Sequence, residues 1–147
     1  MRFTSAALVA ATALATGSLA PPLAAQESAE SPGGMSLELN TIRPSDTGGC
    51  QLVIRGENGT DSSFADVSWV LAVFDGQGAF MSLLSLPLRD MPAGHRKVVQ
   101  FSLDTACTEM SEIIVNDVGK CTLAEGGESG ACLAAKASSR TDIAFGF

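Results

Sequence analysis

The sequence predicts an all-β protein, an antiparallel β-sandwich of about seven strands with two disulfides. Short segments in which apolar and polar residues alternate follow one another from Met35 to Phe147, and this two-residue period is typical of strands with one buried face. Turns containing glycine, proline or asparagine separate these segments, and none of them has the longer period of a convincing helix. Four cysteines follow a leader that is typical of exported proteins, which favours disulfides.

The first two predicted strands form a natural pair along the chain. The first begins at Met35 and alternates apolar with polar residues until the turn-forming segment 44–49. The second begins at Cys50, has apolar residues at every second position, and ends at the turn signal Asn58-Gly59. Asn58-Gly59-Thr60 also matches the glycosylation sequence, but we interpret it as a turn.

The third predicted strand, 67–74, is the most apolar stretch after the leader, and it carries apolar residues on both of its faces. Such a strand lies at the centre of a sheet or is covered on both sides. We expect Trp69 to be a core residue rather than a platform for a stacked ligand. The Gly-rich segment 75–78 then predicts a hairpin into a strand at 79–86, and Pro87 limits further pairing there.

The remaining predicted elements are shorter. We expect an alternating strand at 99–103 and a short buried strand at 113–115. Residues 119–130 are typical of a loop, residues 131–137 could form one or two helical turns, and residues 141–147 alternate again. None of these segments is long enough to change the predicted class.

Residues 1–25 are predicted to be a signal peptide. A basic start and the apolar run 6–20 precede the small-residue cleavage site Leu23-Ala24-Ala25. Cleavage there would leave 26–34 as a flexible N-terminus and 35–147 as a single β-sandwich domain. We therefore expect the protein to be periplasmic or secreted.

The charge of the chain argues against some classes of partner. The chain has 9 basic and 16 acidic residues and a formal net charge of −7 at pH 7, and loss of Arg2 with the leader makes the remainder more negative. Such a surface repels nucleic acid and anionic lipid headgroups. No segment after Gln26 approaches the roughly 20 apolar residues of a membrane-spanning helix. We therefore expect a protein partner in the cell envelope and neither nucleic-acid binding nor membrane insertion. The sequence does not indicate the oligomeric state.

The four cysteines, Cys50, Cys107, Cys121 and Cys132, permit three disulfide pairings, and the sequence does not decide among them. Chain order favours Cys50–Cys107 with Cys121–Cys132, because the first pair flanks strands that can be neighbours and the second encloses a Gly-rich loop. Reactive thiols and a metal site are the alternatives. Structural disulfides are favoured, since no Cys-x-x-Cys occurs and the spacings do not match a structural zinc site.

Residues 52–103 resemble the bacterial immunoglobulin-like modules of the FxLYD type, named for a Phe-x-Leu-Tyr-Asp motif. The matching pieces are Gly56-Glu57-Asn58, Val73-Phe74-Asp75-Gly76, Leu88 with Pro92-Ala93-Gly94, and Phe101-Ser102-Leu103. Phe74 replaces the tyrosine, Ala72 replaces a larger residue, and an extra residue precedes Gly94. The resemblance implies an immunoglobulin-like sandwich with an accessory or interaction role and carries over no catalytic residue. The Ala-rich leader is also similar to that of small secreted proteobacterial proteins.

Few side chains suggest chemistry. His95, the only histidine, follows a turn and lies beside Arg96 and Lys97, and the sequence places no nucleophile and carboxylate around it. Met91 lies four residues before His95, and thioether and imidazole groups are copper ligands. These two residues are therefore the candidates for a metal site, although such sites need further ligands.

The leading functional prediction is a non-enzymatic binding or accessory module of the bacterial cell envelope, with no cofactor and no catalytic residue. We expect its partner to bind an exposed sheet edge or apolar strand, by strand addition. The alternative is a small periplasmic copper carrier that uses Met91 and His95. A hydrolase or redox enzyme is the third hypothesis.

Overall fold

The computed structural model describes residues 33–147, so the predicted signal peptide and most of the predicted flexible segment 26–34 lie outside the described residues. The strands are β1 (Met35–Pro44), β2 (Cys50–Asn58), β3 (Phe64–Asp75), β4 (Phe80–Pro87), β5 (Arg96–Leu103), β6 (Met110–Leu123), β7 (Lys136–Ser139) and β8 (Ala144–Gly146). Two short 3-10 helices accompany them, η1 (Cys107–Glu109) and η2 (Gly130–Cys132).

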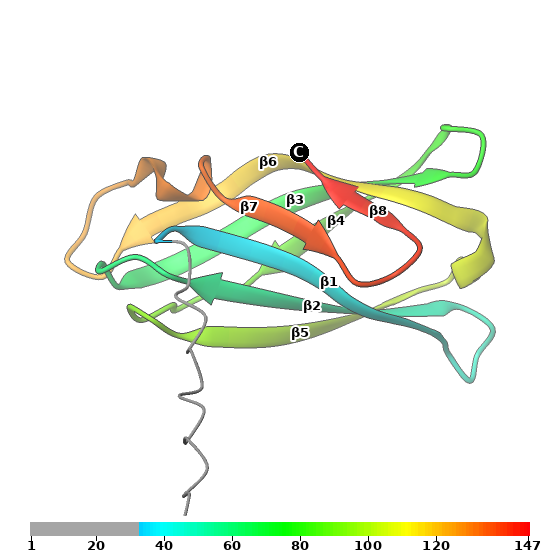
Figure 1. Ribbon diagram of the computed structural model, residues 1–147, viewed down its shortest axis with the longest axis horizontal. Helices are drawn as coiled ribbons and strands as arrows, with labels where there is room; N and C mark the ends of the chain where they lie inside the picture. The colour runs from blue at the N-terminus through cyan, green and yellow to red at the C-terminus, as the bar shows by residue number, and fades with distance from the viewer. Residues whose placement is uncertain (1–32) are drawn as a thin grey trace, which may run out of the picture.

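The strands form two sheets that lie as two layers (Figure 1). Sheet A has the order β5-β2-β1-β7, and sheet B has the order β4-β3-β6-β8. The alternating segments of the sequence supply the inner faces of both sheets, and their apolar residues form one buried cluster. The all-β sandwich predicted from the sequence is confirmed, with eight described strands instead of about seven.

The strand β6 differs most from its prediction. It is 14 residues long and takes up the first part, 119–123, of the segment 119–130 that we expected to be a loop. Its outward side is polar apart from residues such as Ile114, and its pairing with β3 shifts register at several points. Each shift interrupts the two-residue period that identifies a strand in a sequence, so only the buried segment 113–115 was recognisable.

The C-terminal segment departs from the predicted antiparallel arrangement. No α-helix forms at 131–137, since η2 ends at Cys132 and β7 begins at Lys136. β7 pairs parallel with β1, and β8 pairs parallel with β6, so a purely antiparallel sandwich was wrong at these two edges. The chain crosses here from one sheet to the other (Figure 1), and a crossing strand need not run against its neighbour as a hairpin strand must.

Both disulfides fasten peripheral segments to the sheets. Cys50 of β2 is bonded to Cys107 of η1, and Cys121 of β6 is bonded to Cys132 of η2, which is the pairing that chain order favoured. On the chain-entropy model they contribute about 4 and about 3 kcal/mol respectively. The described residues contain no free cysteine. Two disulfides are consistent with an oxidising extracellular or periplasmic environment.

Trp69 lies in the core, as expected. Its side chain is fully buried, and its indole Nε1 donates a hydrogen bond to the carbonyl oxygen of Cys132 at 3.2 Å. The bond satisfies the one polar group of the indole. It also ties the centre of sheet B to the loop that the second disulfide closes.

Asn58 joins three segments at one end of the sandwich. Its fully buried Nδ2 donates to the carbonyl oxygens of Ser62, Met91 and Pro92 at 2.8, 2.9 and 3.1 Å. Its Oδ1 accepts from the backbone amide and the hydroxyl of Thr60. The side chain therefore holds the turn that the sequence predicted, and in the folded protein its amide is enclosed and engaged rather than open to glycosylation.

Candidate binding surface

The two candidate copper ligands lie in different environments. Met91 is fully buried in the core, where its backbone pairs with that of Phe64. His95 is exposed, and its Nδ1 lies 3.2 Å from the carbonyl oxygen of Ala93. Within residues 33–147, no group of three or more His, Cys, Asp or Glu residues is placed to hold a metal. The structure thus does not bring Met91 and His95 to a shared accessible site.

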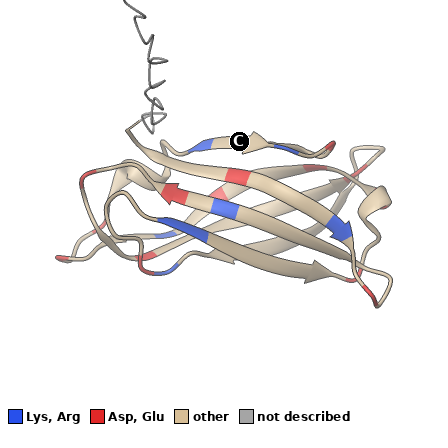
Figure 2. Cartoon of the chain, turned by 60° about the horizontal axis from the view of Figure 1, so that its bottom comes forward, with Lys and Arg blue, Asp and Glu red and all other residues tan. Residues whose placement is uncertain are grey.

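The outer face of sheet A is mostly polar and carries ion pairs between its strands. Glu38 of β1 lies 3.5 Å from Arg55 of β2 and 3.4 Å from Arg140, which follows β7. At the edge of the sheet, Arg96 lies 2.9 Å from Glu57. Figure 2 shows basic and acidic segments spread over the strands of this layer. Such a face is typical of a sheet whose outer side meets water.

The outer face of sheet B carries a cluster of apolar side chains on three neighbouring strands. The inward neighbours Leu71 and Val73 are buried in the core, so Ala72 and Phe74 point outward. Strand register places Leu83 of β4 next to Ala72. Six residues make up this surface, which we call the apolar face: Val70, Ala72, Phe74, Phe80, Leu83 and Ile114.

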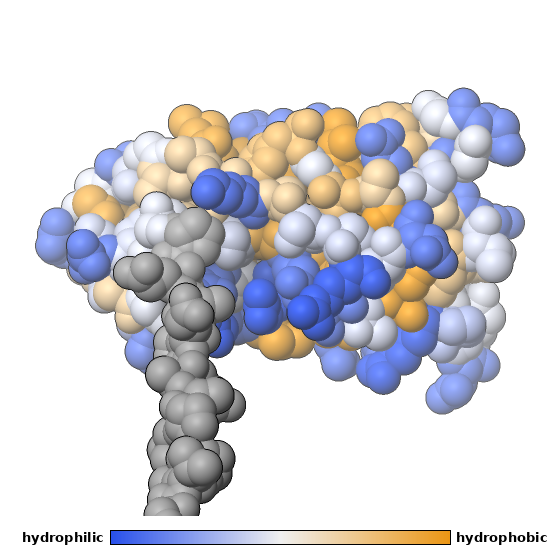
Figure 3. Space-filling model, in the orientation of Figure 1, coloured by the Kyte–Doolittle hydropathy of each residue, from blue (hydrophilic) through white to orange (hydrophobic). Residues whose placement is uncertain are grey.

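The exposure of the apolar face increases toward the β4 edge. Ala72 on β3 is only 3% exposed because larger side chains surround it, whereas Leu83 and Phe80 on β4 are 58% and 59% exposed. The rings of Phe74 and Phe80 meet edge to face with their centroids 6.1 Å apart. Figure 3 shows apolar residues along the upper side of the molecule, where β6 and β8 of sheet B lie, while β4 is behind in this view. No element within residues 33–147 covers Phe80 and Leu83, and an exposed apolar cluster of this kind is typical of an interaction site.

Acidic residues lie beside the apolar face. Glu112 and Asp117 on β6 are exposed and adjoin it on the side away from β4. Among the strands of sheet B as described, the basic residues are limited to Lys120. Its ammonium group lies 2.9 Å from Asp66, and this contact raises the pKa of Lys120. Arg89, which follows β4, lies beside Ser85 and Pro87 at one end of the sheet. On the β6 side, the border of the apolar face is acidic.

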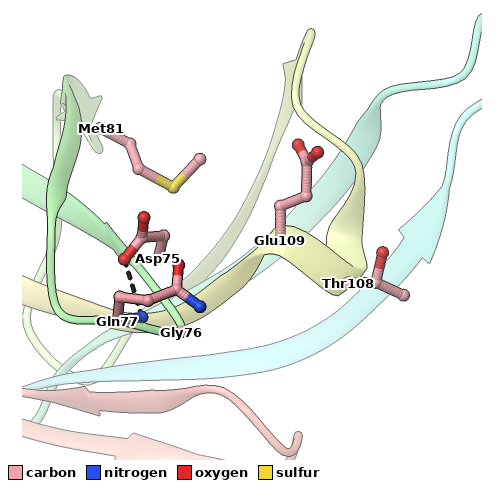
Figure 4. A pocket seen from close by; sticks show the side chains of 6 residues that line it. All are labelled: Asp75, Gly76, Gln77, Met81, Thr108 and Glu109. Carbon is pink, nitrogen blue, oxygen red and sulfur yellow. Dashed lines mark hydrogen bonds between the residues drawn. The ribbon is translucent and has the colours of Figure 1, made fainter.

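A hollow of about 480 Å³ lies where the β3–β4 hairpin approaches η1 (Figure 4). The Asp75 carboxylate accepts hydrogen bonds from the backbone amides of Gln77 and Ala79, both at 2.8 Å. It thereby fixes the hairpin that turns the chain back into β4. Glu109 lies on the opposite side of the hollow from Asp75 (Figure 4), so the two carboxylates do not converge as a pair of catalytic acids would.

The strand predicted at 79–86 corresponds to β4, but no role was predicted for Phe80 and Leu83. The signal that could have found this surface was the apolar second face of 67–74. This segment forms β3, which lies between β4 and β6. Its backbone is therefore paired on both sides, but no other layer of the described fold covers its outer side chains.

Comparisons with protein-family models, with curated proteins and with solved structures found no match for this chain. The resemblance to FxLYD-type modules therefore stays a prediction. Within the described residues, no helix has the length and apolar character needed to cross a membrane.

Proposed function

We propose that the protein is a non-enzymatic binding module of the bacterial cell envelope that takes a partner protein on the apolar face of sheet B. The observation that carries this proposal is the exposure of Phe80 and Leu83 beside outward-facing Phe74. The predicted signal peptide and the two disulfides support a site of action in the periplasm or outside the cell.

The energetics favour a protein partner. Full burial of a Phe or Leu side chain contributes about 1.5–3 kcal/mol, so covering Phe80 and Leu83 would supply the centre of a modest interface. Glu112 and Asp117 lie on β6, at the other side of the apolar face from β4, and they favour a partner with basic residues beside its apolar contact. Both carboxylates would also repel anionic surfaces, in agreement with the negative charge of the chain.

The test is capture from envelope extracts with three forms of the exported protein: wild type, the F80S/L83S double variant, and V98S. Val98 is the matched control, since it is an apolar residue, 61% exposed, on the edge strand of sheet A. We expect a defined protein to be enriched by wild type and V98S and lost with F80S/L83S. The captured protein is then purified, and its direct binding to the three forms is measured.

Enrichment that is equal for all three forms would show that the apolar face does not bind the partner. Failure of wild type to enrich any protein above the F80S/L83S background would also contradict the proposal. The same purified proteins are checked for the far-ultraviolet signal of a folded sheet, so that lost capture is assigned to the surface.

A further inference from the structure

The four sheet edges are protected to very different degrees. β5 carries Arg96 and Lys97, and β7 and β8 are only four and three residues long. Charged residues and short length are the usual ways in which an edge strand avoids pairing with another chain. β4 has neither, since its eight residues contain no charge and its one proline, Pro87, stands at its end. It is the one long uncharged edge among the described strands.

The side chains of the apolar face that lack a neighbour on one side lie on β4. Leu83 and its neighbour Ala72 occupy one row across sheet B, but only Leu83 is largely exposed. The next row repeats the pattern, with Phe80 exposed and Phe74 half-buried. Leu83 and Phe80 lack the lateral neighbour that strands on both sides give to β3. A further strand beside β4 would supply it.

The charge distribution allows that strand to come from a second copy. A chain of net charge −7 can self-associate only where its own acidic residues stay apart. Glu112 and Asp117 lie on β6, two strands from β4. If two copies pair through β4, the two β6 strands are five strand spacings, about 24 Å, apart. This is about three Debye lengths at physiological ionic strength, so their repulsion is largely screened.

We propose that β4 pairs antiparallel with β4 of a second copy, and that a two-fold axis passes near the middle of the strand, between Leu83 and Ser85. Each copy then supplies the same neutral strand, as a closed two-fold interface requires. The two B sheets become one continuous sheet, and their apolar faces become one composite surface. The inference goes beyond the proposed function, because the edge joins the copies while the outer face stays open to a partner.

The test is the mass of the disulfide-bonded exported protein in solution, measured by sedimentation over a wide range of concentration. We expect wild type to reach twice the mass of one chain. Ser85→Lys introduces a charge into β4 and is expected to halve that mass. Ser102→Lys is the matched control, because Ser102 is also an exposed serine on an edge strand, β5, and it is expected to leave the dimer intact.

Wild type that stays at the mass of one chain at every concentration would overturn the inference, as would a dimer that S85K leaves intact. Hydrogen exchange of wild type needs no variant and covers the case in which S85K fails to fold. Protection of β4 amides must rise with concentration while that of β5 amides stays constant; constant β4 protection overturns the pairing. Neither result depends on capture by F80S/L83S, so failure of the dimer and failure of the proposed function are distinguishable.

Discussion

The outer faces of the two sheets cover the same core and yet differ in chemistry. Sheet A presents the ion pairs of Glu38 with Arg55 and of Glu57 with Arg96, whereas sheet B presents Phe80 and Leu83. The buried core cluster consists of residues of the inner faces and of connecting segments such as Leu88 and Met91, and it includes no residue of the apolar face. The apolar character of the outer face of sheet B is therefore not explained by folding, and sheet A demonstrates that this fold is compatible with a polar outer face.

The same contrast holds at the edges. The edge strand β5 of sheet A begins with Arg96-Lys97, while the edge strand β4 of sheet B has no charge along its length. Edge strands are ordinarily blocked against pairing. The apolar face and the unblocked edge thus occur on the same sheet, and both features favour association there.

The largest expected effect is a difference in the free energy of unfolding between substitutions on the inner and the outer side of β4. Leu86 is fully buried and Leu83 is mostly exposed on the same strand, so they form a matched pair. Leu86→Ala is expected to lower the free energy of unfolding by about 2–5 kcal/mol through lost burial and a cavity. Leu83→Ala, at a concentration where the protein is monomeric, is expected to change it by about 0.5 kcal/mol or less.

Urea unfolding of the oxidised protein, followed by the fluorescence of its single tryptophan, Trp69, measures both variants. Equal losses in the two variants would mean that Leu83 belongs to the core. The contrast between the faces would then be one of packing rather than of binding.

The next largest effect concerns the hydrogen bonds by which Asn58, at the end of β2 in sheet A, joins two other segments of the chain. Asn58→Ala removes three hydrogen bonds from Nδ2 and leaves the buried carbonyl oxygen of Met91 without that donor. We expect a loss of about 1–3 kcal/mol in the free energy of unfolding. Asn116→Ala is the control, because Asn116 is exposed on β6 and its loss is expected to be small. Indistinguishable unfolding curves for the two variants would contradict the role of Asn58.

The smallest effect concerns the ion pairs of sheet A. Glu38→Gln weakens the contacts with Arg55 and Arg140, whose side chains are 37% and 68% exposed. For such pairs we expect a loss of about 1 kcal/mol or less, which decreases as salt screens the charges. Thermal unfolding at low and high salt measures it. A large loss that salt does not change would show that the polar face of sheet A has a structural role.

Much of the fold was predictable because it depends on local pattern. Alternation along 50–58 and the two-sided apolar stretch 67–74 identify β2 and β3, and Trp69 lies in the core as predicted. β7 was not predictable, because Lys136–Ser139 contains no large apolar residue and pairs with β1 through its backbone. Pairing of this kind has no hydrophobic period in the sequence.

The candidate surface was only half predictable. Strict alternation would put Phe80 and Leu83 on opposite faces of a strand, since they are three residues apart. A register shift between Val73 and Phe74 brings both to the outer face, where Phe80 pairs with Phe74. Sequence patterning does not show such a bulge. It also does not show whether a second layer of the fold covers an apolar face.

The most direct test of association through the apolar face and the β4 edge is to place a photoreactive amino acid at Leu83 or at Val98 in cells that produce the protein. The two positions are apolar, on edge strands, and almost equally exposed, at 58% and 61%. We expect discrete cross-linked species from position 83, including one of twice the mass of the chain, and none from position 98. Equal cross-linking at both positions, or none at position 83, would contradict it.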